Sequence, residues 1–352
     1  MAALCELESA GIIEKDSKDV LWVWSYPSVS EEQRKVIMRK SPLTTEDKTS
    51  GPPSFVYGQF KHLWYYVMTV YVQGLTTLPK VTGFSLVLIT KDFNPEKYSH
   101  LGRVLCNSYS RSGNPVTVLQ SYLAVFTRGH CNGEENGAFS LKDYEAQQAY
   151  ANGSLKSVVQ RFGVESILIY TALMLKKKVA VFNPTPDDLL IFIRALPAFV
   201  WHRQNWSILH PLVDLEDEEL KEIQESFACV FGTCDASIQN RNELYDMLVN
   251  LQTNEITVSP QAKESMALGK LHKDIALSMV QSAEDESKTE LQMIKDVAGK
   301  TKELLNNLRS LSVEGEDGKS VITLEELRAK KMAANTENFL FGLAAAENLL
   351  ET

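Results

Sequence analysis

The 352-residue chain has few of the residues that most often carry out chemistry or cross-link a fold, with only five cysteines and six histidines. The cysteines are odd in number and show no tight spacing, which argues against a disulfide framework and predicts reduced thiols in a cytoplasmic protein. They are Cys5, Cys106, Cys131, Cys229 and Cys234.

Long apolar runs and an excess of positive charge are also missing. No stretch reaches about 18 uninterrupted apolar residues, so the sequence predicts no transmembrane segment. Residues 1–19 lack the basic stretch followed by an apolar run that marks a secretory signal. With 45 acidic against 36 basic residues the net charge is −9, which argues against a general nucleic-acid binder but does not exclude a local basic patch.

The common catalytic signatures are absent as well. The sequence contains no GxxxxGK[ST], GxGxxG, HExxH or GxSxG pattern. The histidines are dispersed, and His202 and His210 lack the spacing of a zinc pair on one helix. The neighbouring His130 and Cys131 have no further ligands at metal-binding spacing. We therefore expect no covalent catalytic residue, no cofactor and no metal site.

Residues 1–130 carry the pattern of a small α/β sandwich. The sequence VLWVWSY at 20–26 predicts a buried strand, apolar on both faces, and residues 28–40 predict a capped helix followed by a loop over 41–54. Further strands are predicted at 55–60, 62–72 and 84–90, and helices from Pro95 and over 116–129. The Gly- and Asn-rich residues that follow predict a linker at 131–150.

The second half alternates helical and strand patterns. Residues 154–175 predict a helix and 176–182 a strand that is entered through three lysines. Thr185 and Pro186 mark the start of the next helix, with Asp187 and Asp188 in its first turn. Helices predominate from Gln261 onward, and their spacing leaves two alternatives open: packing on the core, or a coiled-coil surface.

The order of these segments resembles the tripartite DENN domain. The resemblance rests on LWVWSYP, then FSLVLITKDFNPEKYSHLGRVLC, then SILIYTALMLKKKVAVFNPTPDDLLIFIRALPAFVWHRQNWSILHPLV, and last FACVFG with LYDMLVNLQTNEITV. It implies an α/β fold with an N-terminal longin-like sandwich and a C-terminal α/β DENN lobe that ends in a helical tail. The implied divisions are a longin-like module at 1–130, a linker at 131–150, a central DENN block at 151–213 and a C-terminal block with helical tail at 214–352.

The same resemblance implies a guanine-nucleotide exchange factor for a Rab-family small GTPase in late-endosomal vesicle trafficking. Such a protein is expected in the cytoplasm and peripherally on late endosomes, and it stabilises the nucleotide-free GTPase in the cleft between two lobes. This activity makes no covalent bond. A nucleotide that binds its GTPase with picomolar affinity is held by roughly 16 kcal/mol. An exchange factor that binds the nucleotide-free GTPase preferentially lowers the affinity of the GTPase for the nucleotide.

Three residues of the longin-like module are candidates for GTPase binding and exchange. Tyr26 ends a strand just before Pro27, where an aromatic ring with a hydroxyl can anchor an interface. The alternative is one more core aromatic beside Trp22 and Trp24. Gln59 and Lys61, at the predicted hairpin, are the other two candidates.

The stretch ALPAFVWHRQNWSILHPLV at 195–213 combines tryptophans with polar residues. We expect Trp201 and Trp206 in the core, and His202, Arg203 and Gln204 in a surface loop that contacts a partner. The alternative function is a non-catalytic binding subunit that docks on coiled-coil proteins of the Commander endosomal recycling assembly. For the last helix, residues 337–350, packing is favoured over membrane binding because no basic face flanks it.

Overall fold

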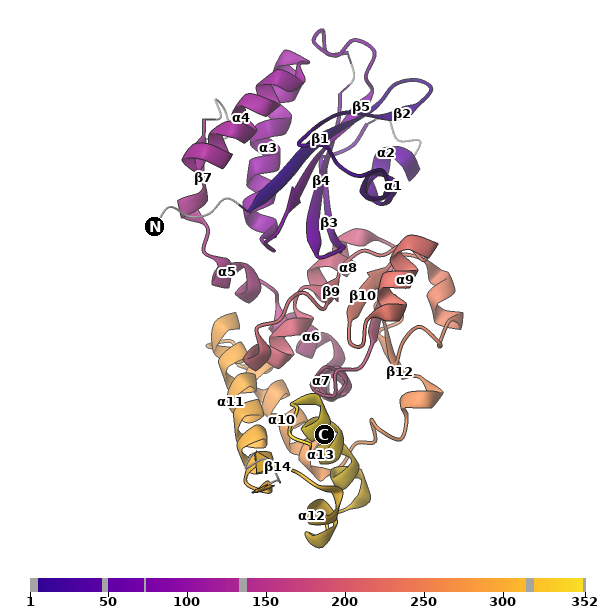
Figure 1. Cartoon of the computed structure of the whole chain (residues 1–352), viewed down its shortest axis with the longest axis vertical. Helices are drawn as coiled ribbons and strands as arrows, with labels where there is room; N and C mark the ends of the chain where they lie inside the picture. Colours follow the sequence, from indigo (N-terminus) through magenta and orange to yellow (C-terminus); the bar gives the residue numbers. More distant parts are fainter. Residues whose placement is uncertain (1–5, 46–49, 73, 133–137, 315–319, 351–352) are drawn as a thin grey trace. The chain divides into compact units, whose positions relative to one another are not determined.

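The computed structural model describes residues 6–45, 50–72, 74–132, 138–314 and 320–350. The chain divides into two compact units, residues 1–150 and 151–352 (Figure 1). Each unit contains a five-stranded sheet. Among the described residues, no helix has both the length and the apolar character needed to cross a bilayer.

The first unit is built on an antiparallel sheet with the strand order β2-β1-β5-β4-β3. Its strands are β1 (Leu7–Lys15), β2 (Val20–Tyr26), β3 (Ser54–Phe60), β4 (Leu63–Tyr71) and β5 (Gly83–Thr90). The central strand β5 is buried along its whole length, as its run of apolar residues requires. The strands predicted at 55–60, 62–72 and 84–90 are confirmed.

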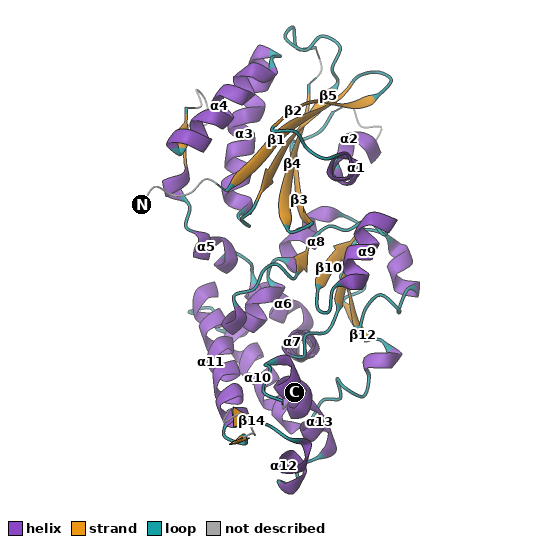
Figure 2. Cartoon of the chain, in the orientation of Figure 1, coloured by secondary structure: helices purple, strands orange, loops and turns teal. Residues whose placement is uncertain are grey.

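Helices cover both faces of this sheet (Figure 2). On one side lie α1 (Glu31–Lys40) and α2 (Pro42–Thr45), and on the other α3 (Pro95–Ser112) and α4 (Pro115–Arg128). The predicted helix start at Pro95 is confirmed, because the Asn94 side chain accepts a hydrogen bond from the Lys97 amide at 3.0 Å. The helix α2 occupies the beginning of the segment that was predicted to be a loop.

Two features of this sheet differ from the prediction. The first strand, β1, was not predicted, so VLWVWSY is the second strand rather than the first. The prediction that β2 is buried on both faces is wrong, since Leu21 is 58% exposed and Val23 44% exposed. The physical reason is position: β2 lies at the edge of the sheet beside β1, so one side of the strand is open.

Short elements occupy part of the predicted linker. The strand β6 (His130–Cys131) pairs with β7 (Phe139–Ser140), and η1 (Leu141–Asp143) and α5 (Ala146–Ala151) follow. Residues 133–137 of that segment and Cys5 lie outside the described residues. Within the described ranges, no group of three or more His, Cys, Asp or Glu side chains is placed to hold a metal ion.

The second unit has a mixed sheet with the order β12-β11-β8-β10-β9. The strands β11, β8, β10 and β9 are parallel, and β12 pairs antiparallel with β11 at the edge. Their bounds are β8 (Val179–Phe182), β9 (Leu209–His210), β10 (Val230–Thr233), β11 (Met247–Asn250) and β12 (Glu255–Val258). Two helices pack near this sheet, α8 (Pro186–Ile193) and α9 (Asp217–Glu225).

A helical layer completes the second unit. It comprises α6 (Leu155–Phe162), η2 (Gly163–Glu165), α7 (Ser166–Met174), η3 (Leu196–Arg203), α10 (Lys270–Glu284) and α11 (Glu290–Arg309). The single helix predicted at 154–175 is therefore wrong: it breaks at Gly163, whose φ of 54° ends α6. Of the two alternatives for the C-terminal helices, packing on the core is observed, since α10 contacts α6 and α7 while α11 contacts η3.

The last described elements are a short hairpin and two helices. They are β13 (Val313–Glu314), β14 (Ser320–Val321), α12 (Leu324–Ala329) and α13 (Ala334–Ala346). Residues 315–319, within the segment predicted to be a loop, are outside the described ranges. The predicted terminal helix corresponds to α13, whose Phe339 and Leu343 are buried, so this helix packs on the unit rather than presenting its apolar side.

Candidate functional site

Tyr26 is a surface residue at the end of β2. Its side chain is 43% exposed, and its ring lies edge-to-face on Tyr122 of α4, with centroids 6.0 Å apart and an interplanar angle of 83°. Tyr122 is buried and stacks in turn on Phe126 at 6.1 Å, and Phe126 is 50% exposed. These three rings form an aromatic row that holds the Tyr26 ring in place at the surface.

Gln59 and Lys61 lie at the hairpin between β3 and β4. Gln59 pairs with Trp64, and its side chain is buried. Lys61 occupies the turn with a φ of 50°, and its ammonium group forms an ion pair with Glu32 in the first turn of α1. Gln59 is therefore buried, whereas the Lys61 side chain lies at the surface.

The sheet register relates these residues to each other. Tyr26 pairs with Ala10 and Ala10 with Leu88, while Trp64 pairs with Thr90 at the end of β5. Tyr26 and the β3–β4 hairpin are thus at the same end of the sheet, but at opposite edges. Three to four strand spacings separate them, or roughly 14–19 Å across the sheet. The structure does not bring these residues into contact; they lie at the two edges of the same end of the sheet.

In the second unit, His202, Arg203 and Gln204 form the end of η3 and the turn after it. Trp206 is buried as predicted, whereas Trp201, also predicted in the core, is only partly buried because it lines a pocket; the two rings lie edge-to-face at 5.5 Å. Gln204 adopts a left-handed conformation, with φ of 48°, and donates from Nε2 to the Trp201 carbonyl oxygen at 2.7 Å. The expected polar turn is therefore present.

Arg203, in contrast, is committed to contacts within its own chain. Its Nη1 donates to the Leu173 carbonyl oxygen and its Nη2 to that of Met174, both at 2.6 Å, at the carboxyl end of α7. Its Nε donates to Oε1 of Glu347, just after α13, at 3.1 Å. His202 Nε2 lies 3.3 Å from the same Glu347 oxygen. Sequence reasoning did not find Glu347, because 144 residues separate it from Arg203.

The environment of Glu347 favours its charged form. Partial burial raises the pKa of this carboxyl, but hydrogen bonds from His202 and Arg203, together with their charges, outweigh burial and lower the pKa to about 2. The Arg203–Glu347 pair therefore joins the end of α7, the end of η3 and the end of α13 at neutral pH.

A pocket of about 650 Å³ lies beside this pair. Trp201, His202 and Arg203 line one part of it, and side chains of α11 line another. The α11 residues are Ala298, Lys302, Leu305, Asn306 and Arg309, and Lys176, Asn205 and Glu347 complete the lining. The sequence offered no signal for this pocket beyond the three lysines at 176–178 that precede β8.

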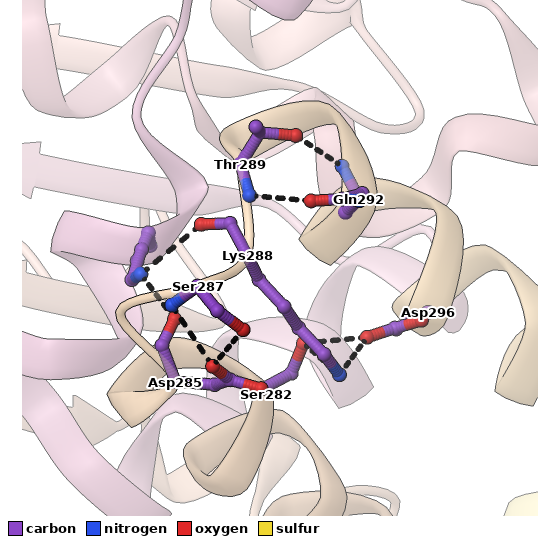
Figure 3. Close-up of polar contacts among 8 residues, drawn as sticks. Ser282, Asp285, Ser287, Lys288, Thr289, Gln292 and Asp296 are labelled. Atoms are coloured by element: carbon purple, nitrogen blue, oxygen red, sulfur yellow. Dashed lines mark hydrogen bonds and ion pairs between the residues drawn. The ribbon is translucent and has the colours of Figure 1, made fainter.

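The corner between α10 and α11 fixes the start of α11 (Figure 3). Thr289 and Gln292 exchange hydrogen bonds in a capping box, and Asp296 accepts from Ser282 at 2.7 Å and from Lys288 at 2.6 Å. Lys156 of α6 donates from Nζ to the Asp285 carbonyl oxygen at 2.7 Å. These contacts tie α11 to α10 and α6, so the wall that α11 gives to the pocket is anchored at its amino end.

Comparison with known proteins decides the family. The chain is 50% identical to DENN domain-containing protein 10 of Danio rerio over 344 residues, which cover 97% of both chains. It is 48% identical to DENN domain-containing protein 10 of Homo sapiens over 343 residues, which cover 97% of this chain and 96% of the relative.

The chain belongs to the DENN domain-containing protein 10 family. A relative of the same name from Dictyostelium discoideum is 38% identical over 367 residues, across 99% of this chain and 100% of its own. Residues 152–260 also match the family model described as "Stabilization of polarity axis". The resemblance to DENN-domain proteins and the α/β fold class are thereby confirmed.

Proposed function

We propose that this member of the DENN domain-containing protein 10 family is a guanine-nucleotide exchange factor for a Rab-family small GTPase. It acts in the cytoplasm and peripherally on late endosomes, in vesicle trafficking, and it binds the nucleotide-free GTPase between its two lobes. The family membership supports the proposal, because exchange on Rab proteins is the activity that the DENN resemblance implies.

One observation carries the proposal furthest: the exposed Tyr26 ring at the end of β2, held by Tyr122. Tyrosine is enriched among the residues that dominate the binding energy of interfaces. A ring that already rests on a neighbouring ring loses little freedom when a partner covers it, so less of the binding energy is lost to ordering.

The spacing of the candidates suits one interface. A protein interface of ordinary size covers roughly 800 Å² on each partner, or about 28 Å across. Tyr26 and Lys61, which are three to four strand spacings or roughly 17 Å apart across the sheet, both fall within such an area. Exchange requires that this surface bind the nucleotide-free GTPase more tightly than the GDP-bound form, because only that difference weakens the hold on the nucleotide.

Affinity measurements on paired GTPase states test this proposal. A panel of Rab proteins, each nucleotide-free or loaded with GDP, is titrated against the wild-type chain and the variant Tyr26→Ala. We expect at least one Rab to bind more tightly when nucleotide-free, with roughly tenfold weaker binding to Tyr26→Ala, a loss of about 1.4 kcal/mol. Leu21→Ala is the matched control, since Leu21 is exposed on the same strand at its other end. Equal affinities of both states for every Rab contradict the proposal.

A second candidate function is docking, without exchange, on coiled-coil proteins of the Commander endosomal recycling assembly. The helix α4 favours it, because Val116, Leu123 and Phe126 are exposed with spacings of seven and three residues, the pattern that faces a partner helix. Val116 lies six residues before Tyr122, the nearest member of the aromatic row on α4, or about 1.7 helical turns away, so the variant Val116→Glu changes the helix outside that row. Two results together support docking over exchange. The variant Val116→Glu no longer co-purifies with Commander coiled-coil subunits, and the wild-type chain does not accelerate GDP release from any Rab.

A further inference from the structure

We propose that the pocket between η3 and α11 binds a compact anion that carries several phosphate groups, such as an inositol polyphosphate or the headgroup of a phosphoinositide. The pocket lies wholly within the second unit and is separate from the surface around Tyr26. Neither the family name nor the proposed exchange activity assigns it a role.

The charge of the lining is the first argument. The lining contains four basic side chains and a single carboxylate, that of Glu347, so its formal charge is +3. The basic residues are Lys176, Arg203, Lys302 and Arg309. This excess sits in a chain whose net charge is −9. A concave site lined by one sign of charge concentrates its field, so the pocket attracts anions although the whole chain repels them.

The pairing of these cations is the second argument. Arg203 is held by Glu347 and by two carbonyl oxygens, so it forms a fixed side of the pocket. Within the part of the chain that the structure describes, the charged groups of Lys176, Lys302 and Arg309 have neither a hydrogen bond nor an ion pair. Three like charges that share one cavity repel one another, and a bound polyanion removes that repulsion.

Helix geometry shows that two of these charges can reach one ligand. Lys302, Asn306 and Arg309 follow each other along one side of α11, at spacings of four and three residues. The rise of 1.5 Å per residue places Lys302 and Arg309 roughly 10 Å apart along the axis. Lys176 comes from the turn after α7, a separate element of the lining. Cations from two elements around one cavity favour a compact ligand with several charges over an extended acidic peptide.

The size and the neutral residues agree with this class of ligand. A volume of about 650 Å³ is in the range of pockets that hold small molecules. The side-chain amides of Asn205 and Asn306 offer further donors, and Trp201 and Leu305 give the pocket an apolar part. Phosphate groups with a carbon ring between them match such a mixture of donors and apolar surface.

Calorimetric titration of the full chain with inositol hexakisphosphate tests the proposal. The test variant is the double charge reversal Lys302→Glu with Arg309→Glu, both exposed on α11. The matched control is Lys295→Glu with Lys300→Glu, which makes the same charge change on the same helix outside the pocket lining. We expect binding to weaken roughly 30-fold in the test variant and less than about threefold in the control.

Vesicles distinguish the two sources of phosphate. Association with phosphatidylcholine vesicles that carry phosphatidylinositol bisphosphate, lost in the test variant and displaced by inositol hexakisphosphate, identifies a lipid headgroup. Binding of the soluble probe without vesicle association identifies a free ligand, and either result supports the site. No binding of inositol hexakisphosphate by the wild-type chain, equal weakening in both double variants, or tighter binding of a glutamate decapeptide than of the probe overturns the proposal.

Discussion

Arg203 and Glu347 are joined by a hydrogen bond of 3.1 Å from Nε to Oε1, although they are 144 residues apart in the chain. The same guanidinium donates to the carbonyl oxygens of Leu173 and Met174, which end α7. One side chain therefore satisfies helix-end acceptors and also neutralises a partly buried carboxylate. The pair fixes the last described helix to the body of the second unit.

Glu347→Gln is expected to lower the free energy of unfolding by about 2 kcal/mol at pH 7, because it removes the charge that Arg203 and His202 stabilise. The pKa of Glu347 is about 2 in the folded chain and 4.5 ordinarily. The stabilisation is therefore complete above pH 4.5 and lost as the pH falls toward 2.

Urea unfolding at pH 7 and pH 3 measures the difference between the wild-type chain and Glu347→Gln, which should shrink at pH 3. Glu303→Gln, an exposed carboxylate paired with Lys300 on α11, is the control. An unchanged difference at pH 3 contradicts the assignment.

His272 gives the second unit a pH dependence in a milder range. It lies buried near the start of α10, accepts a hydrogen bond from the Gly269 amide on Nδ1 at 3.0 Å, and contacts the Phe339 ring of α13. Burial lowers its pKa from 6.5 to about 4. The unfolded chain takes up a proton below pH 6.5 while the folded chain resists it, so stability falls as the pH drops from 6.5 toward 4.

The variant His272→Gln keeps a capping acceptor but does not titrate. We expect the wild-type chain to lose about 2 kcal/mol more than this variant between pH 7.5 and pH 5, measured by urea unfolding at both values. If the two proteins lose the same free energy over that interval, His272 is not the group responsible.

A buried hydrogen bond between Tyr170 and Thr301 predicts an asymmetry between two substitutions. The hydroxyls are 3.0 Å apart and join α7 to α11, and Thr301 also donates to the Val297 carbonyl oxygen. Tyr170→Phe leaves Thr301 with that second partner and is expected to cost about 1 kcal/mol.

Thr301→Val leaves the buried Tyr170 hydroxyl without an acceptor and is expected to cost about 2 kcal/mol. The double variant is expected to cost less than the sum, because the unpaired hydroxyl is then gone. Denaturant unfolding of all three variants measures these costs. Equal costs that add in the double variant contradict this account of the bond.

The parts of the fold that were predicted correctly have strong local signals. The helix α8 begins where Thr185, Pro186 and two aspartates indicated, since the fixed φ of proline and the helix dipole act within a few residues, although the Thr185 side chain makes no capping hydrogen bond. The edge position of β2 was missed, because a run of apolar residues does not show how many neighbours a strand has. The strand β1 was missed because LESAGIIEK mixes strand-forming residues with Glu and Ala.

The candidate site residues also differ in how far the sequence alone predicts their positions. The surface position of Tyr26 follows from Pro27 and the strand end, both visible in the sequence. The commitment of Arg203 to Glu347, and the meeting of Lys176 with Lys302 and Arg309 around one pocket, depend on how α7, η3 and α11 pack. Contacts between residues more than a hundred positions apart leave no pattern in a single sequence.

The rate of GDP release from Rab proteins tests the central claim most directly. Each Rab of a panel is loaded with fluorescent GDP, and release is followed after addition of the wild-type chain, Tyr26→Ala, Tyr26→Phe or the control Leu21→Ala. The proposed function predicts faster release from at least one Rab, roughly tenfold less acceleration with Tyr26→Ala, and near wild-type rates with Tyr26→Phe and Leu21→Ala. No acceleration for any Rab by the folded wild-type chain would contradict it.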